Sequence, residues 1–408
     1  MKMTKYKLGE LVEVTRGASL SGQFYAEEGK LIRLTLGNFN MNGGGFKENT
    51  SKTDLYFTGT VRDEFILNKG DIITPLTEQS LGLLGTTARI PESGKYIQSQ
   101  DVALVRCKKG LLDPNFCYYL ISSSIVRQQL SAAAQQTKIR HTSPEKIKDC
   151  TVWVPDFDVQ KNIGRILTDI DNKIAINRQI NDNLEAMAKQ LYDYWFVQFD
   201  FPNEEGKPYK SSGGAMVWNE KLKREIPQGW NDCKIKDFMR IFTGKKDVSK
   251  AVPGNYKFFS CAPEPISSNE YIYDGYAVLV SGNGSYTGRV GFYKGKFDLY
   301  QRTYACVLDE DEHNISFFYY TLRYLFQPIY SGGKHGSSIP YIVLGDLADF
   351  RFAFNETICT KFVDAAKPMF DEQLLRQKEI EALTKQRDEL LPLLMNGQAS
   401  VNYHLSAC

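Results

Sequence analysis

The sequence predicts an α+β protein in which two β-rich globular modules are joined by two long antiparallel coiled-coil helices. Three observations support this fold class: an internal repeat, an apolar stripe with heptad spacing in each copy, and short β-branched and aromatic runs between glycine-rich turns. The expected parts are residues 1–155 (first module), 156–200 (first helix), 201–227 (surface linker), 228–354 (second module), 355–397 (second helix) and 398–408 (tail).

The repeat is an ordered series of six matched segments. Tyr6–Gly17 returns as Cys233–Gly244, 227 positions later, and Leu184–Gln190 returns as Ile380–Gln386, 196 positions later. The four pairs between them are Lys69–Pro75 with Asp274–Val280, Ala88–Ile90 with Gly288–Val290, Phe116–Tyr119 with Phe317–Tyr320, and Ser143–Pro144 with Ile339–Pro340. Six matches in one order make chance similarity a poor explanation, and they predict a pseudo-two-fold internal repeat.

Both helical segments carry an apolar seam every seven residues, the pattern of a coiled coil. In the first helix the seam is Ile163, Ile170, Asn177, Leu184 and Leu191, with a companion row of Ile166, Lys173, Ile180, Met187 and Tyr194. The seam residues of the second helix include Phe362, Met369, Gln373, Ile380 and Leu383. A helix of about 40 residues is ~60 Å long. If the ends of the second module lie close together, the second helix runs back along the first.

Two features of the helices leave alternatives open. Asn177 and Gln373 occupy the same seam position, where a polar amide either fixes the register of the pair or is simply tolerated by solvent. Pro368 interrupts the second helical pattern, which indicates either a kink or a late start of that helix.

The order of these parts resembles the specificity (S) subunit of type I restriction–modification systems. The resemblance rests on the linker ending Ile226–Trp230 and on the helix ends Leu191–Val197 and Leu383–Gly397, and it covers nearly the whole chain. It implies two target recognition domains, each reading one half of a split sequence in double-stranded DNA. It also implies that the helices dock two methyltransferase (M) subunits and restriction (R) subunits. Those partners would use S-adenosylmethionine, ATP and Mg, and this chain would need no cofactor and do no chemistry.

The residues themselves are consistent with a chain that performs no catalysis. No Pro-Pro occurs, so the adenine-methyltransferase motif is missing, and no G-x-x-x-x-G-K-[ST] phosphate loop is present. The glycine loop Ser281–Gly288 does not match the dinucleotide fingerprint, and the eight cysteines and four histidines show no metal-binding spacing. The polar N-terminus and the lack of a long apolar run predict a cytoplasmic protein without a membrane segment.

Basic residues are gathered in patches although the net charge is only +2. The best candidates to contact DNA are a polar basic loop and a turn that occur in both modules. In the first module they contribute Gln79, Ser80, Thr86, Arg89, Lys138, Arg140 and His141. In the second module they contribute Asn283, Ser285, Tyr286, Arg289, Lys334, His335 and Ser337. Arg89 and Arg289 either bind a guanine edge or form structural ion pairs. Each basic loop either contacts DNA or is a solvated loop without a function in binding.

An aromatic run ends the first helix: Tyr192, Tyr194, Trp195, Phe196, Phe199 and Phe201. It either packs against the globular module of its own copy or docks a partner subunit. The leading hypothesis is a DNA-specificity and scaffold subunit. The rivals are a DNA-modifying enzyme, methyltransferase or nuclease, with an unrecognised motif, and a coiled-coil adaptor with lectin-like or peptide-binding heads.

Overall fold

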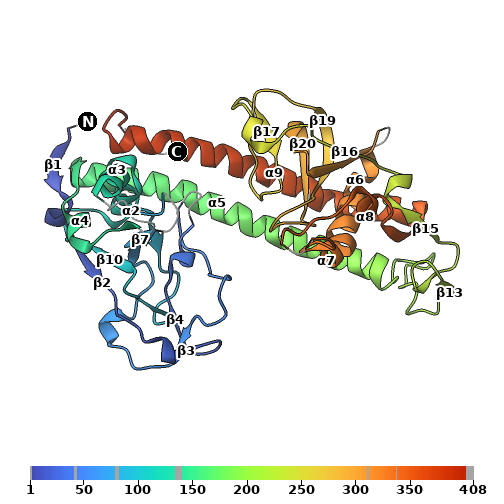
Figure 1. Ribbon diagram of the computed structural model, residues 1–408, viewed down its shortest axis with the longest axis horizontal. Helices are drawn as coiled ribbons and strands as arrows, with labels where there is room; N and C mark the ends of the chain where they lie inside the picture. The colour runs from blue at the N-terminus through green and yellow to red at the C-terminus, as the bar shows by residue number, and fades with distance from the viewer. Residues whose placement is uncertain are drawn as a thin grey trace. The chain divides into compact units, whose positions relative to one another are not determined.

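The computed structural model describes residues 2–40, 44–78, 82–133, 140–309, 312–336 and 338–400. The chain forms two compact units, of which the first is discontinuous in sequence and the second is continuous (Figure 1). Unit 1 consists of Met1–Asn177 and Lys378–Cys408, and unit 2 is Arg178–Gln377. Each unit therefore combines one globular module with a part of each long helix, whereas the sequence suggested separate helical domains.

Unit 1 contains a four-stranded antiparallel sheet of order β2-β10-β6-β8. A second four-stranded sheet, of order β3-β5-β4-β9, is smaller because its strands are shorter. Its strands are β1 (Thr4–Lys7), β2 (Val12–Arg16), β3 (Tyr25–Ala26), β4 (Leu31–Arg33), β5 (Tyr56–Phe57), β6 (Ile72–Pro75), β7 (Thr77–Glu78), β8 (Ala88–Arg89), β9 (Tyr96–Ile97), β10 (Val102–Cys107), β11 (Arg140–His141) and β12 (Thr151–Val154). Its short helices are α1 (Leu8–Leu11), α2 (Pro114–Ser122), α3 (Ser124–Ala133) and α4 (Pro144–Lys148). The main core joins the larger sheet and α2 to both long helices, since Ile163, Leu394 and Met395 are buried in it.

Unit 2 is built on a six-stranded sheet of order β16-β21-β19-β20-β17-β18. Its strands are β13 (Met216–Asn219), β14 (Arg224–Pro227), β15 (Asn231–Lys234), β16 (Arg240–Thr243), β17 (Tyr256–Phe259), β18 (Ile266–Ser268), β19 (Tyr273–Ser281), β20 (Val290–Leu299), β21 (Thr303–Val307) and β22 (Arg351–Phe354). Its short helices are α6 (Ile315–Thr321), α7 (Gln327–Tyr330) and α8 (Leu344–Ala348). A large aromatic core joins α6 to both long helices.

The two modules share a common topology, as the repeat predicts. In each, a first strand pairs with the last strand of the module (β1 with β12, β15 with β22), and the next strand lies at the edge of the main sheet. Gly17 and Gly244 end the equivalent edge strands, where an added Cβ would lie 2.2 Å from the Gln98 carbonyl oxygen and 1.5 Å from that of Leu299. Only glycine permits such a close backbone approach, which explains why both copies retain it.

One match of the repeat is wrong. Ser143 precedes Pro144, the first residue of α4, and in unit 2 Val343 precedes Leu344, the first residue of α8. The counterpart of Ser143–Pro144 is therefore Val343–Leu344 rather than Ile339–Pro340. The hydrogen bonds support this corrected alignment, because the residues just before Ser143 and Val343 make equivalent bonds. Thr142 N donates to Leu76 O at 2.8 Å, and Ile342 N donates to Gly282 O at 2.9 Å. Proline at the first turn of α4 suggested a match with another proline, but leucine occupies that place in α8.

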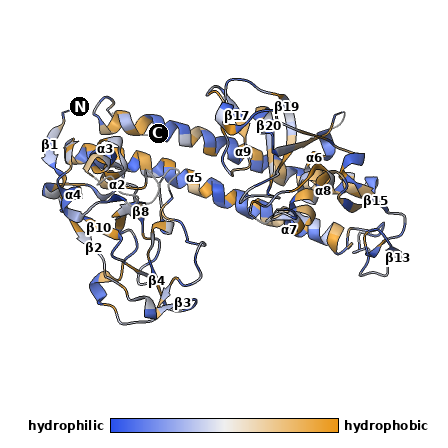
Figure 2. Ribbon diagram, viewed as in Figure 1, coloured by the Kyte–Doolittle hydropathy of each residue, from blue (hydrophilic) through white to orange (hydrophobic). Residues whose placement is uncertain are grey.

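The long helices are α5 (Phe157–Tyr192), which continues into a π-helical turn at Asp193–Val197, and α9 (Glu356–Met395). Figure 2 shows hydrophobic and hydrophilic residues alternating along both helices. They pack antiparallel within each unit. In unit 1, Asp171 accepts from Arg387 at 3.0 Å and Asn177 donates to Glu379 at 3.0 Å. In unit 2, Gln373 donates to Glu185 at 3.2 Å, while Phe362 packs on Trp195.

Burial along α5 agrees with the predicted seam and differs from the predicted companion row. The seam residues of both helices are buried or half-buried, and Asn177 is only 2% exposed, so it is not a solvated residue. The second buried row is Leu167, Ile174, Asn181, Ala188 and Trp195, one residue later than predicted. The predicted companions Lys173, Met187 and Tyr194 are exposed. Pro368 lies inside α9, which begins at Glu356, so a late helix start is wrong.

The segment expected to be a surface linker is folded onto unit 2. Strands β13 and β14 form a hairpin, and Phe201, Ile226 and Trp230 are buried in the aromatic core of this unit. The aromatic run at the end of α5 packs into the same core, apart from the exposed Tyr194. It therefore packs against the second module and not against the module of its own copy. No helix of the described residues is long and apolar enough to cross a membrane.

Candidate nucleic-acid interface

In unit 1 the described part of the predicted turn lies beside Arg140 and His141, which belong to the described end of the predicted basic loop. The strand pair β7–β11 aligns Glu78 with Arg140 and Thr77 with His141. The turn that follows, at residues 82–87, is held against α3 because the Arg127 guanidinium donates to the Gly82 carbonyl. Residues far apart in the sequence therefore form one surface, as the prediction of a shared site requires.

A buried carboxylate organises this surface. Glu78 is 2% exposed, and its Oε2 accepts from the backbone N–H groups of Gly82, Leu83 and Leu84 at 3.1, 2.9 and 3.0 Å. Its Oε1 forms an ion pair with Arg140 at 3.1 Å, and Arg140 also donates to the Ser131 hydroxyl at 3.1 Å. The Arg140 guanidinium is therefore paired inside the module and is not presented as a free phosphate contact. His141 is exposed.

Arg89 lies in β8, just after the turn at residues 82–87, and its side chain is directed inward. Its guanidinium stacks on the Tyr118 ring at 4.8 Å, and its Nη2 is buried without a hydrogen-bond partner among the described residues. Thr86 is only 3% exposed and donates to the Gly82 carbonyl at 3.4 Å. The described residues form no ion pair with Arg89, and a contact with a base would require this side chain to rotate outward.

Unit 2 brings its two predicted segments together in the same way. The turn at residues 282–289 and the loop at residues 331–342 are joined because Gly284 N donates to Pro340 O at 2.9 Å. The Thr287 hydroxyl also donates to Pro340 O at 2.9 Å. No carboxylate corresponds to Glu78, since the aligned position is Gly284. The two modules therefore support their loops by different chemistry.

Arg289 repeats the inward placement of Arg89. Its Nη2 donates to the Ala262 carbonyl at 2.9 Å, and its Nε is buried without a partner among the described residues. Burial, followed by the nearby Arg323, lowers the pKa of Arg289 from its ordinary value. Within the described chain neither candidate arginine pairs with a carboxylate, so the structural ion-pair interpretation is not supported for either.

The groups that unit 2 exposes lie at the tips of the turn and the loop. Ser285, Tyr286, Lys334 and His335 are exposed, and Asn283 is half-buried. Lys334 lies over the Tyr330 ring at 4.3 Å, and the His335 ring stacks on Tyr341 while its Nε2 lies 3.0 Å from Asp346. The candidates Gln79, Ser80, Lys138 and Ser337 lie outside the described residues.

Sequence reasoning missed two kinds of residue at this surface. The first is Glu78, a single acidic residue among candidate base readers, whose role depends on contacts that no sequence pattern shows. The second is a group of exposed apolar side chains in unit 2, including Ile339, which is 63% exposed. An isoleucine followed by a proline reads as the start of a strand, so the sequence carried no signal of exposure.

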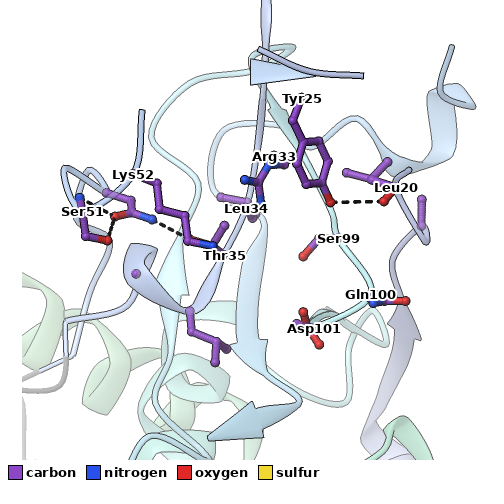
Figure 3. A pocket seen from close by; sticks show the side chains of 14 residues that line it. Leu20, Tyr25, Arg33, Leu34, Thr35, Ser51, Lys52, Ser99, Gln100 and Asp101 are labelled. Atoms are coloured by element: carbon purple, nitrogen blue, oxygen red, sulfur yellow. Dashed lines mark hydrogen bonds between the residues drawn. The ribbon is translucent and has the colours of Figure 1, made fainter. Parts of the chain in front are cut away.

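A polar cavity of about 320 Å³ lies at the small sheet of unit 1, away from the predicted residues. In Figure 3, Tyr25 and Arg33 line its upper part, while Ser99 and Asp101 line the opposite side. The Arg33 guanidinium stacks on the Tyr25 ring at 3.7 Å and pairs with Asp54 at 3.1 Å. The Arg33 guanidinium is therefore already paired within the module. No cluster of metal-ligating side chains occurs among the described residues.

Comparison with known proteins assigns the family. The model of the type I restriction modification DNA specificity domain matches residues 1–186 and 227–354, which include both modules. The chain belongs to this family. A specificity subunit of Methanocaldococcus jannaschii, that of the type I restriction enzyme MjaIX, is 25% identical over 72% of this chain and 71% of its own length. The EcoDI specificity subunit of Escherichia coli is 32% identical over 43% of this chain and 39% of its own length.

The specificity-family assignment agrees with the fold. The crystal structure of a type I restriction-modification S subunit from M. genitalium superposes with a TM-score of 0.60 over 97% of this chain and 96% of that one, at 17% identity. That likeness establishes a shared fold and nothing further. The resemblance inferred from the helix ends and the linker is confirmed by the family match.

Proposed function

We propose that this chain is the DNA sequence-specificity subunit of a type I restriction–modification complex. The observation that carries the proposal is the duplicated match to the DNA specificity domain, once over residues 1–186 and once over 227–354. Two such domains in one chain suit a target made of two separated half-sites. Each module would act as a target recognition domain and read one half-site through its turn and its loop.

The two half-sites are expected to differ, because the modules present different groups. Unit 1 supports its turn with the buried carboxylate of Glu78, whereas unit 2 has Gly284 at that position. Thr86 is buried where Tyr286 is 48% exposed. Side chains that differ in size and hydrogen-bonding capacity select different bases. An asymmetric bipartite target follows.

The long helices would serve as the docking platform, paired as a coiled coil. Their matched segments keep one offset of 196 residues, so they can offer two similar surfaces to two identical M subunits, with R subunits joining the assembly. The proposed chain is not itself an enzyme. S-adenosylmethionine, ATP and Mg would be bound by the partner subunits, and the complex would act in the cytoplasm.

Reconstitution with the methyltransferase subunits of its own system tests the proposal. The complex should methylate duplexes from a random library at one split sequence with a fixed spacer, and its affinity should fall steeply with salt because phosphate contacts release counterions. The purified chain alone should transfer no methyl group. Methylation by the chain alone, or a complex that selects no split sequence, would contradict the proposal.

A further inference from the structure

The turn and loop of unit 2 expose a group of large apolar side chains beside polar and basic ones. The apolar patch consists of Tyr286, Ile339, Tyr341, Val343 and Leu344, which are 48%, 63%, 39%, 42% and 49% exposed. Such residues are usually buried, and several of them in adjoining segments indicate a surface that meets another molecule.

Backbone contacts hold the two segments of the patch in place. The Pro340 carbonyl oxygen accepts hydrogen bonds from both Gly284 and Thr287, which lie on either side of Tyr286 in the turn. Tyr341 forms isolated β-bridges with Asn283 and His335. The turn and the loop that carry the apolar side chains are therefore held side by side by contacts that do not depend on those side chains.

A glycine makes the tight loop possible. Gly336 has a φ of +82°, and a Cβ there would lie 2.3 Å from the Ile339 carbonyl oxygen. An L side chain would be strained at this φ and would collide with backbone, so the loop around Ile339 depends on glycine. The exposure of Ile339 is thus a consequence of how the backbone is built.

The surroundings of the patch favour DNA as the molecule it meets. Lys334 and His335 are exposed on the same loop, and Ser285 is exposed next to Tyr286. Basic side chains such as Lys334 can contact phosphates, and hydroxyl side chains such as Ser285 can hydrogen-bond to base edges. The apolar group that base edges offer in the major groove is the C5-methyl of thymine.

We infer that the apolar patch, through Ile339 and Tyr286, reads a thymine methyl group in the half-site of unit 2. This inference rests on the proposed function, since it names the chemistry of one reading surface. It makes unit 2 sensitive to a single methyl group. Unit 1 differs at the position aligned with Tyr286, where Thr86 is 3% exposed. Loss of Ile339 should therefore affect only one of the two half-sites.

The test replaces thymine by deoxyuridine, which removes the C5-methyl and keeps every hydrogen-bonding atom. The reconstituted complex is given its selected target, and each thymine is replaced in turn. We expect one position in the unit 2 half-site to lose about fourfold in affinity, the value of burying one such group. Ile339→Ala should abolish this difference while leaving the affinity for the deoxyuridine duplex unchanged within about twofold.

Val252→Ala is the matched control, because Val252 is 55% exposed in unit 2 outside the patch. This variant should keep the thymine preference, and both variants should keep the unfolding temperature of the wild type, since neither side chain is buried. Deoxyuridine substitutions in the other half-site should respond identically in wild type and Ile339→Ala.

Three results would overturn the inference. One is a unit 2 half-site in which no deoxyuridine substitution weakens binding. Another is a thymine preference that persists in both Ile339→Ala and Tyr286→Ala. The third is an Ile339→Ala complex that loses methyltransferase subunits while keeping the preference, which would assign the patch to protein docking. If the complex selects no split target at all, the proposed function fails and this inference fails with it. Selection without any methyl effect refutes the inference alone.

Discussion

Replacing Glu78 by glutamine should loosen the candidate reading turn of unit 1, at residues 82–87. The carboxylate is 2% exposed and receives three backbone N–H groups and the Arg140 guanidinium. Glutamine retains one acceptor oxygen, which can satisfy the backbone groups only if its NH₂ then faces the guanidinium. Two donors would oppose each other, and Arg140 would lose its counter-charge.

The magnitude follows from the burial of the pair. Breaking a buried ion pair by removing one partner costs about 3–5 kcal/mol. Arg140 is 18% exposed and keeps its bond to Ser131, so a value of about 2–3 kcal/mol is expected for a partly solvated cation. Amide exchange in a peptide containing residues 82–84 should then be faster by about 30- to 150-fold, because each 1.36 kcal/mol is a factor of ten.

Hydrogen exchange measured by mass spectrometry checks this prediction, with Glu64→Gln as the control. Glu64 is 59% exposed and pairs with Arg62 at the surface, so its replacement should change stability by less than about 0.5 kcal/mol. If Glu78→Gln exchanged at the wild-type rate in residues 82–84, the carboxylate would not be holding the turn, and the reasoning above would be refuted.

Three further predictions concern the core, pH and salt. Phe362→Ala should lower the free energy of unfolding by about 3–5 kcal/mol in urea, because Phe362 is fully buried, whereas Leu375→Ala on the same helix, 56% exposed, should change it little. Hydrogen bonds from Lys234 and Lys236 lower the pKa of Asp349 to about 2. At low salt the stability lost in Asp349→Asn, seen as the urea midpoint, should therefore be present above pH 4 and disappear as pH falls toward 2. Lys334→Ala should weaken binding of all sequences alike and reduce the slope of log affinity against log salt by about one, and an unchanged slope would remove this lysine from the phosphate contacts.

The sequence predicted the repeat, the two β-rich modules and the helix seam, because each depends on local periodicity. The companion row of α5 was misplaced by one residue because Ile163 is followed by apolar side chains at both 166 and 167. Spacing of three and spacing of four both fit a helix. Only tertiary packing selects the row that contains Leu167, which is buried in the core of unit 1.

The remaining errors have a common physical origin in contacts between distant segments. Glycine, proline and serine made residues 202–228 look like a surface linker, but Phe201 and Trp230 at its ends are buried in the core of unit 2. Arg89 and Arg289 were assigned to base edges by residue type, while their side chains lie inward because Tyr118 and the Ala262 carbonyl attract them. Residue type indicates chemistry, and the tertiary structure decides whether that chemistry is presented.

The discontinuity of unit 1 in sequence has a consequence for synthesis. The core of unit 1 includes Leu394 and Met395, so its first 177 residues leave the ribosome before two of their packing partners exist. Residues 178–377 are made in between, on the order of 10–40 s at typical translation rates. Throughout that interval the first module exposes the apolar face of α5 that α9 will cover. A growing chain therefore exposes apolar surface until α9 is made, and a chain cut short within α9 would lack the residues that cover it.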